Sequence, residues 1–236
     1  MLNSNNNQRL NIKELIKEYK LNKNFYINLT NNVINSVSDR LCHHKVIVLY
    51  IIQKFINIET YLELGVHNGA SMSYVVNYDS KKFCFGIDLF EDTYIKNYFK
   101  DNLLTNKSYK NIQNNNKNNS DITLIKGNTN NISTEQKFIE YYRNVLGDKV
   151  IEVDLLFIDA DHNYKPLLKD LKTYTKYLKK NGILILDDYP TGGGGGTKKA
   201  LDEFLKTGNY EIIGGFNLNP GKKQFNQYPI ILQKLS

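Results

Sequence analysis

The sequence predicts an α/β fold, in which one mostly parallel sheet carries helices on both faces. Two observations support this. First, short apolar runs of strand length alternate with longer segments of helical spacing, which is typical of βαβ units. Second, two β-rich runs near the end of the sequence flank a turn-forming stretch, which predicts an antiparallel hairpin. With 236 residues, of which 41% are hydrophobic and 23% charged, the sequence predicts a single packed core.

The expected elements follow one another along the chain. The parallel strands are predicted at Thr60–Leu64, Phe83–Leu89, Ile122–Lys126, Val153–Asp159 and Ile183–Asp188. The crossover helices are predicted at Ala70–Asn77, Thr93–Leu104, Thr134–Leu146, Lys165–Lys180 and Lys198–Lys206. Helical spacing also marks Asn11–Tyr19, Phe25–Val37 and His43–Ile56, while the hairpin uses Tyr210–Phe216 and Tyr228–Leu235 around a turn at Asn219–Gly221. The sheet should therefore have seven strands.

Composition divides the chain further. Residues 1–40 are expected to form a polar tail and a helical cap, and residues 41–236 the α/β domain. The Asn-rich segment Asn111–Asn119 predicts a mobile surface loop that is dispensable for folding. The glycine run Thr191–Gly196 predicts either a mobile lid over a site or a flexible spacer.

Charge and apolar runs limit the partners. The formal net charge is +7, but the lysines are scattered, so a solvated surface is expected and nucleic acid is an unlikely partner. The longest apolar run, Val46–Ile52, is far below the ~20 residues of a membrane span, so no membrane partner is expected. The two cysteines, Cys42 and Cys84, lack metal-type spacing and fit a reducing, cytoplasmic location. The sequence leaves both a monomer and a homo-oligomer open.

The segment Glu63–Ser71 follows a strand and opens a helix. Gly65 permits a sharp turn, Gly69 permits close approach of a ligand, and the helix start presents unpaired N–H groups. A ligand with a carboxylate or phosphate is expected there, although a tight turn without a ligand is the alternative. The spacing differs from the dinucleotide fingerprint, which argues against NAD. The residues expected to line the ligand are Glu63, Gly65, Asn68, Gly69, Ala70 and Ser71.

The next two strand ends carry polar residues. Asp88 ends the second strand, where a carboxylate can accept hydrogen bonds from ribose hydroxyls; its alternative role is a helix cap. Asn128 follows the third strand and can pair with the edge of a base, although a simple turn explains it too. Together these positions predict a nucleoside site.

Acidic residues gather after the fourth and fifth strands. Asp159, Asp161 and His162 follow one strand, and Asp187 and Asp188 end the other. Converging carboxylates repel one another, and a divalent cation, a protonated acid or a basic partner relieves this. An oxygen-ligand site for Mg²⁺ or Mn²⁺ is the interpretation we favour.

In combination, these motifs resemble the class I S-adenosylmethionine-dependent methyltransferases, especially the group of macrocin and related sugar O-methyltransferases, and more distantly catechol and caffeoyl-coenzyme A O-methyltransferases. The resemblance covers residue 43 to the end and rests on Glu63-Leu-Gly65, Gly69-Ala-Ser71, Asp88, Phe157-Ile-Asp159-Ala-Asp161-His162-Asn-Tyr164 and Gly182-Ile-Leu-Ile-Leu-Asp187-Asp188-Tyr189. It implies a Rossmann-like fold and S-adenosylmethionine as cofactor, with Asp159 also beside it. It further implies Mg²⁺ or another divalent cation bound by Asp159, Asp187 and Asp188.

The resemblance also implies a reaction, methyl transfer to a hydroxyl of a small molecule or sugar. In some members a histidine three residues after the first metal-binding Asp is the general base, which is His162 here. In others an acid two residues after it has that role, which is Asp161. We expect His162, because imidazole titrates near neutrality, while a capping residue is its alternative role. Two other hypotheses stay open: a related enzyme with different metal chemistry, and a non-catalytic nucleic-acid-associated module that binds S-adenosylmethionine.

Overall fold

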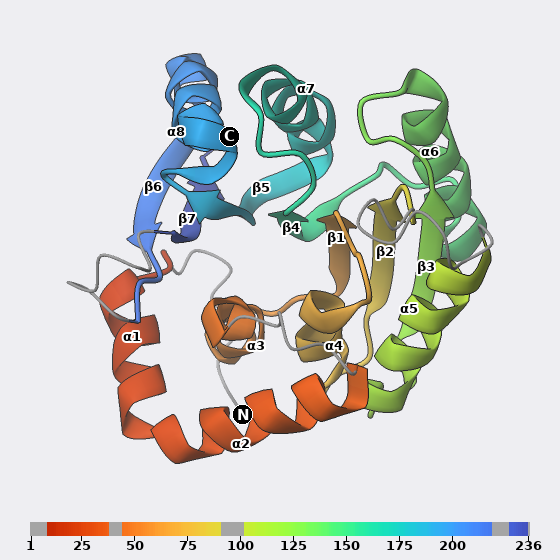
Figure 1. The fold of residues 1–236 in the computed structure, drawn as a ribbon. Coiled ribbons are helices and arrows are strands. Elements are labelled where there is room, and N and C mark those ends of the chain that lie inside the picture. The colour runs from red at the N-terminus through yellow and green to blue at the C-terminus, as the bar shows by residue number, and fades with distance from the viewer. Residues whose placement is uncertain (1–8, 38–43, 91–101, 219–226, 236) are drawn as a thin grey trace.

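The computed structural model describes residues 9–37, 44–90, 102–218 and 227–235, and it shows one seven-stranded sheet (Figure 1). The strand order is β3-β2-β1-β4-β5-β7-β6. The strands are β1 (Thr60–Leu64), β2 (Phe83–Asp88), β3 (Asp121–Lys126), β4 (Val153–Ile158), β5 (Leu178–Tyr189), β6 (Tyr210–Gly215) and β7 (Tyr228–Lys234). This confirms the predicted α/β fold.

The first five strands are parallel, and the last two are not. β1 pairs in parallel with β2 and β4, while β3 and β5 extend the sheet on either side. β7 lies between β5 and β6 and is antiparallel to both, as the predicted hairpin requires. The expected turn at Asn219–Gly221 lies outside the described residues. All five parallel strands therefore end at one edge of the sheet, where ligands bind in open α/β sheets.

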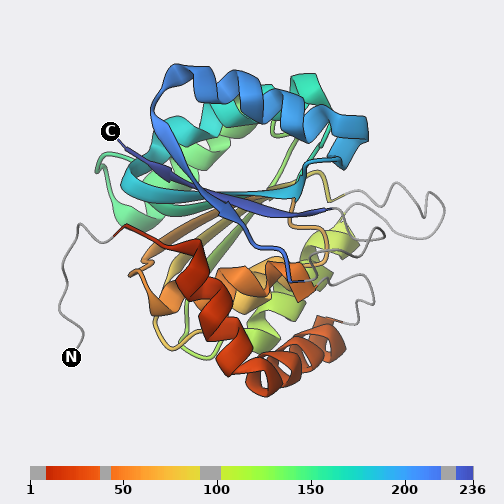
Figure 2. The same cartoon turned by 90° about the vertical axis from the view of Figure 1, so that its left-hand side faces the viewer.

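Helices cover both faces of the sheet (Figure 2). One face carries α6 (Ile132–Leu146), α7 (Tyr164–Tyr174) and α8 (Gly192–Phe204); the other carries α1 (Ile12–Leu21), α2 (Lys23–Val37), α3 (Val48–Ile51), α4 (Ala70–Val76) and α5 (Asn102–Asn115). None of the described helices combines the length and hydropathy needed to cross a membrane.

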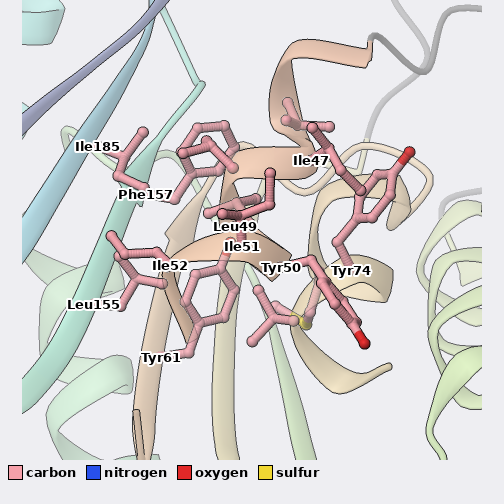
Figure 3. Close-up of a cluster of buried hydrophobic side chains, with 14 of the residues drawn as sticks. Ile47, Leu49, Tyr50, Ile51, Ile52, Tyr61, Tyr74, Leu155, Phe157 and Ile185 are labelled. Carbon is pink, nitrogen blue, oxygen red and sulfur yellow. The ribbon is translucent and has the colours of Figure 1, made fainter. Parts of the chain in front are cut away.

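Strand alternation divides the core into two layers. In β4, Leu155 and Phe157 face the layer under α1–α5, whereas Leu156 and Ile158 face the layer under α6–α8. The short helix α3 lies at the centre of the first layer, where Leu49 and Ile52 pack near Leu155 (Figure 3). The cap helices α1 and α2 contribute buried residues to this same layer.

Two helix predictions need correction, and a third lies mostly outside the described residues. The stretch His43–Ile56 is interrupted, because a 3₁₀ turn stands on each side of α3. The helix expected at Lys165–Lys180 ends earlier, and Leu178 already pairs with Val153 as strand residue. Leu178 fits an apolar helix stripe and a buried strand equally well, so hydrophobic periodicity did not distinguish a helix from a strand at this position. Most of Thr93–Leu104 lies outside the described residues, and α5 starts at Asn102.

The prediction of a mobile loop at Asn111–Asn119 was wrong. Helix α5 continues through Asn115, and Ile112 is fully buried. The buried side chains of Asn111 and Asn115 are satisfied by hydrogen bonds to Asn68 O and Asn111 O. One face of α5 carries Ser108, Asn111 and Ile112, and the low-complexity composition of the segment did not reveal it.

Candidate active site

The turn after β1 meets the end of β4. Gly65 has a φ of +88°, and a Cβ at this position would lie 2.2 Å from the carbonyl oxygen of Asp159. Only glycine combines this backbone conformation with so close an approach. The turn that is predicted to bind the cofactor, Gly65–Gly69, therefore contacts the backbone of Asp159 in the acidic cluster. We call Gly65–Gly69 the cofactor turn.

Helix α5 holds this turn in place. Ser108 Oγ donates to His67 O, Asn111 Nδ2 donates to Asn68 O over 2.9 Å, and Ile112 packs against Gly69. Asn68, Gly69 and Ala70 are buried. Sequence reasoning missed these supporting residues, although their helical spacing within the Asn-rich segment was a usable signal.

Asp88 sits beside the same turn. Its two carboxylate oxygens accept hydrogen bonds from the backbone N–H groups of His67 (2.8 Å) and Phe90 (2.6 Å). Each oxygen keeps a second lone pair for a ligand. Asp88 thus fixes the turn, and its contact with a ribose stays a prediction.

Glu63 lies beneath the turn and is fully buried. Tyr61 OH donates to its Oε2 over 2.9 Å, and Ser71 Oγ donates to its Oε1. Burial raises the pKa of Glu63 to about 8, against the lowering effect of these hydroxyls. Both carboxylate oxygens of Glu63 accept hydrogen bonds inside the protein. Glu63 would therefore affect cofactor binding by positioning Ser71.

Glu63→Gln is expected to flatten the pH dependence of stability between pH 4.5 and about 8. The folded state keeps a proton on Glu63 that the unfolded chain releases, so the contribution of Glu63 to stability is largest at acidic pH and falls as the pH rises through this window. Glutamine resembles the protonated acid and removes the loss. Melting temperatures at pH 5 and pH 8 measure it, and equal slopes in both proteins would contradict the prediction.

The loop after β3 is held from α7. Asn128 is exposed, and its Oδ1 accepts the N–H of Asn130 over 2.8 Å. Behind it, the buried carboxyl of Asp170 accepts hydrogen bonds from Thr129 Oγ1 and Asn130 Nδ2, both at 2.9 Å. Burial raises the pKa of Asp170 to about 7. Asp170 escaped sequence reasoning because it lies inside a helix, away from any motif.

His162 is at the centre of the acidic cluster. Its Nε2 lies 3.4 Å from Asp159 Oδ1 and 3.3 Å from Asp188 Oδ2. Its Nδ1 lies 3.2 Å from Ala160 O, which can only accept, so we assign the hydrogen of neutral imidazole to Nδ1. Nε2 is then the basic nitrogen, and a proton on it would be stabilised by both carboxylates.

The other two acids are placed differently. Asp161 is exposed, and its Oδ1 accepts hydrogen bonds from Asn163 N (2.8 Å) and Asn163 Nδ2 (2.7 Å), which orders the start of α7. Asp187 is 3% exposed, and Asp188 follows it with a positive φ of 52°. The structure thus brings Asp159 and Asp188 together on His162.

A divalent cation fits this edge in part. Asp159 and Asp188 face one point, and carboxylate oxygens are the ligands that Mg²⁺ prefers. Within the part of the chain that the structure describes, no three His, Cys, Asp or Glu side chains form a ready metal site. Both carboxylates also face His162 Nε2, so an ion bound here would lie beside the imidazole.

The glycine run is neither an open lid nor a spacer. Gly192–Gly196 form the kinked start of α8, in which Gly193, Gly194 and Gly195 have positive φ. Gly192 and Gly196 are buried. The run packs against the backbone after β4, at His162 and Asn163.

Comparison with protein families gives one match. A family described as a methyltransferase domain matches residues 62–189, which contain the turn after β1, Asp88 and the complete acidic cluster. A curated relative, an uncharacterized protein of Acanthamoeba polyphaga mimivirus, is 29% identical over 135 residues. The match covers 55% of this chain and 51% of that protein, so the chain spans about half the length of this relative.

Solved structures share the fold. An O-methyltransferase from Bacillus cereus in complex with SAH matches with a TM-score of 0.55 and 10% identity, over 95% of this chain and 100% of that one. A TDP-rhamnose 3'-O-methyltransferase of calicheamicin biosynthesis matches at 0.53 and 15%, over 97% and 88%. The O-methyltransferase TomG from Streptomyces achromogenes, in complex with SAM, matches at 0.56 and 9%, over 89% of both chains.

Proposed function

The chain belongs to the methyltransferase-domain family matched over residues 62–189, and we propose that it transfers a methyl group from S-adenosylmethionine to a hydroxyl of a small molecule or sugar. The recognition of a class I methyltransferase is thereby confirmed. The observation that carries the finer proposal is His162, whose basic nitrogen lies between two carboxylates beside the cofactor turn.

We assign the three parts of the cofactor to three strand ends. The turn Gly65–Gly69 would receive the methionine part, Asp88 would bind the ribose hydroxyls, and Asn128 would meet the adenine. Support comes from the hydrogen bonds that order these loops and from Asp88 keeping free acceptor capacity. Bound S-adenosylmethionine would supply an activated methyl group on its sulfonium.

His162 would prepare the acceptor. Its Nε2 would accept the proton of the acceptor hydroxyl, so that the acceptor oxygen could bond to the methyl group that S-adenosylmethionine would supply, with the sulfur keeping the electron pair of the bond it loses. Asp159 and Asp188 stabilise the imidazolium that forms, and the proton then passes to solvent. Positioning of the two reactants supplies the remaining rate enhancement.

The acceptor class rests on the neighbours' names. Structures with this fold include sugar and small-molecule O-methyltransferases, one of which is named for TDP-rhamnose. A hydroxyl acceptor also agrees with a base of imidazole type, because a hydroxyl must lose its proton to become an effective nucleophile.

Calorimetry is expected to show binding of S-adenosylhomocysteine to the wild type and no binding of NAD. Asp88→Ala should weaken S-adenosylhomocysteine binding by roughly 1–3 kcal/mol, the cost of losing hydrogen bonds to a charged group. Unchanged affinity would restrict Asp88 to supporting the turn. In a screen of hydroxyl acceptors with labelled S-adenosylmethionine, binding without any transfer would favour the non-catalytic module.

We propose in addition that Mg²⁺ or another divalent cation binds at Asp159, Asp187 and Asp188. The support is the shared orientation of Asp159 and Asp188 and the hardness of their oxygens. Such an ion would act as a Lewis acid on the acceptor oxygen.

This cation is expected to raise the melting temperature, because it binds the folded state. Thermal melts with Mg²⁺, with Mn²⁺ and with EDTA test this without an acceptor, and Asp188→Asn should abolish the shift. If none of these additions changes the melting temperature and methyl transfer is complete in EDTA, the proposal of a bound cation is refuted. His162 is then the partner of the carboxylates.

A further inference from the structure

Three of the five glycines at the start of α8 lie against the proposed base. A Cβ at Gly192 would lie 2.9 Å from His162 Cδ2, within the imidazole ring. A Cβ at Gly193 would lie 2.1 Å from His162 O, and a Cβ at Gly196 would lie 2.5 Å from the same oxygen. Three glycines thus meet the ring and the carbonyl of one residue.

Contacts this short leave no room for a side chain. A real Cβ does not approach a backbone oxygen within 3.0 Å, so one of the two segments has to move. His162 O belongs to the peptide that joins His162 to Asn163, the N-cap of α7. Asp161 orders Asn163, and the helix that follows packs on the sheet. A side chain at Gly193 or Gly196 would therefore push the start of α7, and His162 with it.

Gly194 differs from Gly193 although the two are neighbours. Both have positive φ, +65° and +56°, but a Cβ at Gly194 meets nothing within 4 Å. The conformational cost of an alanine is therefore similar at both positions, whereas the steric conflict with His162 exists at one only.

We propose that Gly192, Gly193 and Gly196 are positioning residues for the methyl transfer, which hold His162 Nε2 between Asp159 and Asp188. We call these three glycines the His162 brace. This inference rests on the proposed function, because it needs His162 as the base. The brace fixes His162 from the side of α8, while Ala160 O fixes the ring through Nδ1.

The position of the base matters because proton transfer needs hydrogen-bond reach, and a displacement of about 1 Å can lower a rate roughly 100-fold. His162 Nε2 lies 3.3–3.4 Å from both carboxylates, so a displacement of this size would remove its contact with at least one of them. Glycine is required here for close packing, which is the opposite of a mobile lid.

The test compares Gly193→Ala and Gly196→Ala with Gly194→Ala as the matched control. NMR signals of the His162 ring, assigned with His162→Gln, should shift in the first two variants and stay in place in the control. Calorimetry with S-adenosylhomocysteine should give wild-type affinity in all three. With an acceptor from the screen, kcat should fall roughly 100-fold in the brace variants, with the KM for S-adenosylmethionine little changed.

Several outcomes separate the possibilities. Ring signals and kcat in Gly193→Ala and Gly196→Ala that match those of Gly194→Ala would overturn the brace. If Gly193→Ala does not fold, Gly196→Ala still decides the question, because its glycine has no positive φ and only the steric conflict remains. Full activity of His162→Gln would instead refute the base assignment, and failure of the wild type to bind S-adenosylhomocysteine would refute the proposed function.

Discussion

His162→Ala is expected to lower kcat by roughly 10²–10⁴-fold, the usual loss when a general base is removed. Nε2 is the basic nitrogen that faces both carboxylates, and Ala160 O leaves Nδ1 with the hydrogen. Binding of S-adenosylhomocysteine should persist, because Asp88 and the Gly65–Gly69 turn do not contact His162 in any hydrogen bond described.

The measurement is a single-turnover assay across pH with an acceptor from the screen. The wild type should lose rate at low pH, where the general base is protonated, and the variant should lack this limb. Asp161 is the competing base. Full activity in His162→Ala together with a large loss in Asp161→Asn would assign the proton transfer to Asp161.

Gly65→Ala is expected to have the largest effect on stability, at least about 4 kcal/mol. Its Cβ would lie 2.2 Å from Asp159 O and 2.5 Å from Asp159 C, so either the turn or the end of β4 has to move. Both sides of this contact are anchored, since Gly65 N donates to Ile87 O and Asp159 N donates to Leu64 O.

Gly147→Ala is the matched control for Gly65→Ala. Gly147 has a similar φ of +80°, but a Cβ there meets nothing within 4 Å. It should cost less, about 1–3 kcal/mol, because its φ of 80° and ψ of 179° lie in a region that is essentially restricted to glycine. Chemical denaturation of both variants measures the difference, and calorimetry with S-adenosylhomocysteine shows whether any folded Gly65→Ala protein keeps the site. Equal losses in the two variants would show that the contact with Asp159 relaxes freely.

The two comparisons share one physical basis. At Gly65 and at Gly193, a glycine lets separate parts of the chain approach within a distance that no side chain permits. One contact joins the cofactor turn to Asp159, and the other joins α8 to His162. The proposed active site is therefore assembled from backbone contacts as well as from side chains.

The sequence by itself determined the strands that bear the site. Apolar runs located all seven strands, and parallel order placed Asp88, Asp159 and Asp188 at one edge, because the ends of parallel strands must meet there. The glycine spacing after β1 also predicts a site that differs from a dinucleotide site.

Only the tertiary structure decided how the acids pair. Asp187 and Asp188 are neighbours at the end of β5, where the pairing with β7 is irregular and Asp188 has a positive φ of 52°, and the one whose carboxylate meets His162 is Asp188. Asp161, equally close to His162 in sequence, orders Asn163 instead. Local sequence contains no information on such convergence.

Tertiary contacts also give two low-complexity segments a structure that their composition did not predict. The Asn-rich segment is helix because Asn111 and Ile112 find buried partners at Asn68 and Gly69, and the glycine run is packed because His162 O lies against it. Composition predicts mobility where a segment lacks groups that can bury. Here distant parts of the chain supply the partners, and burial against them decides the structure.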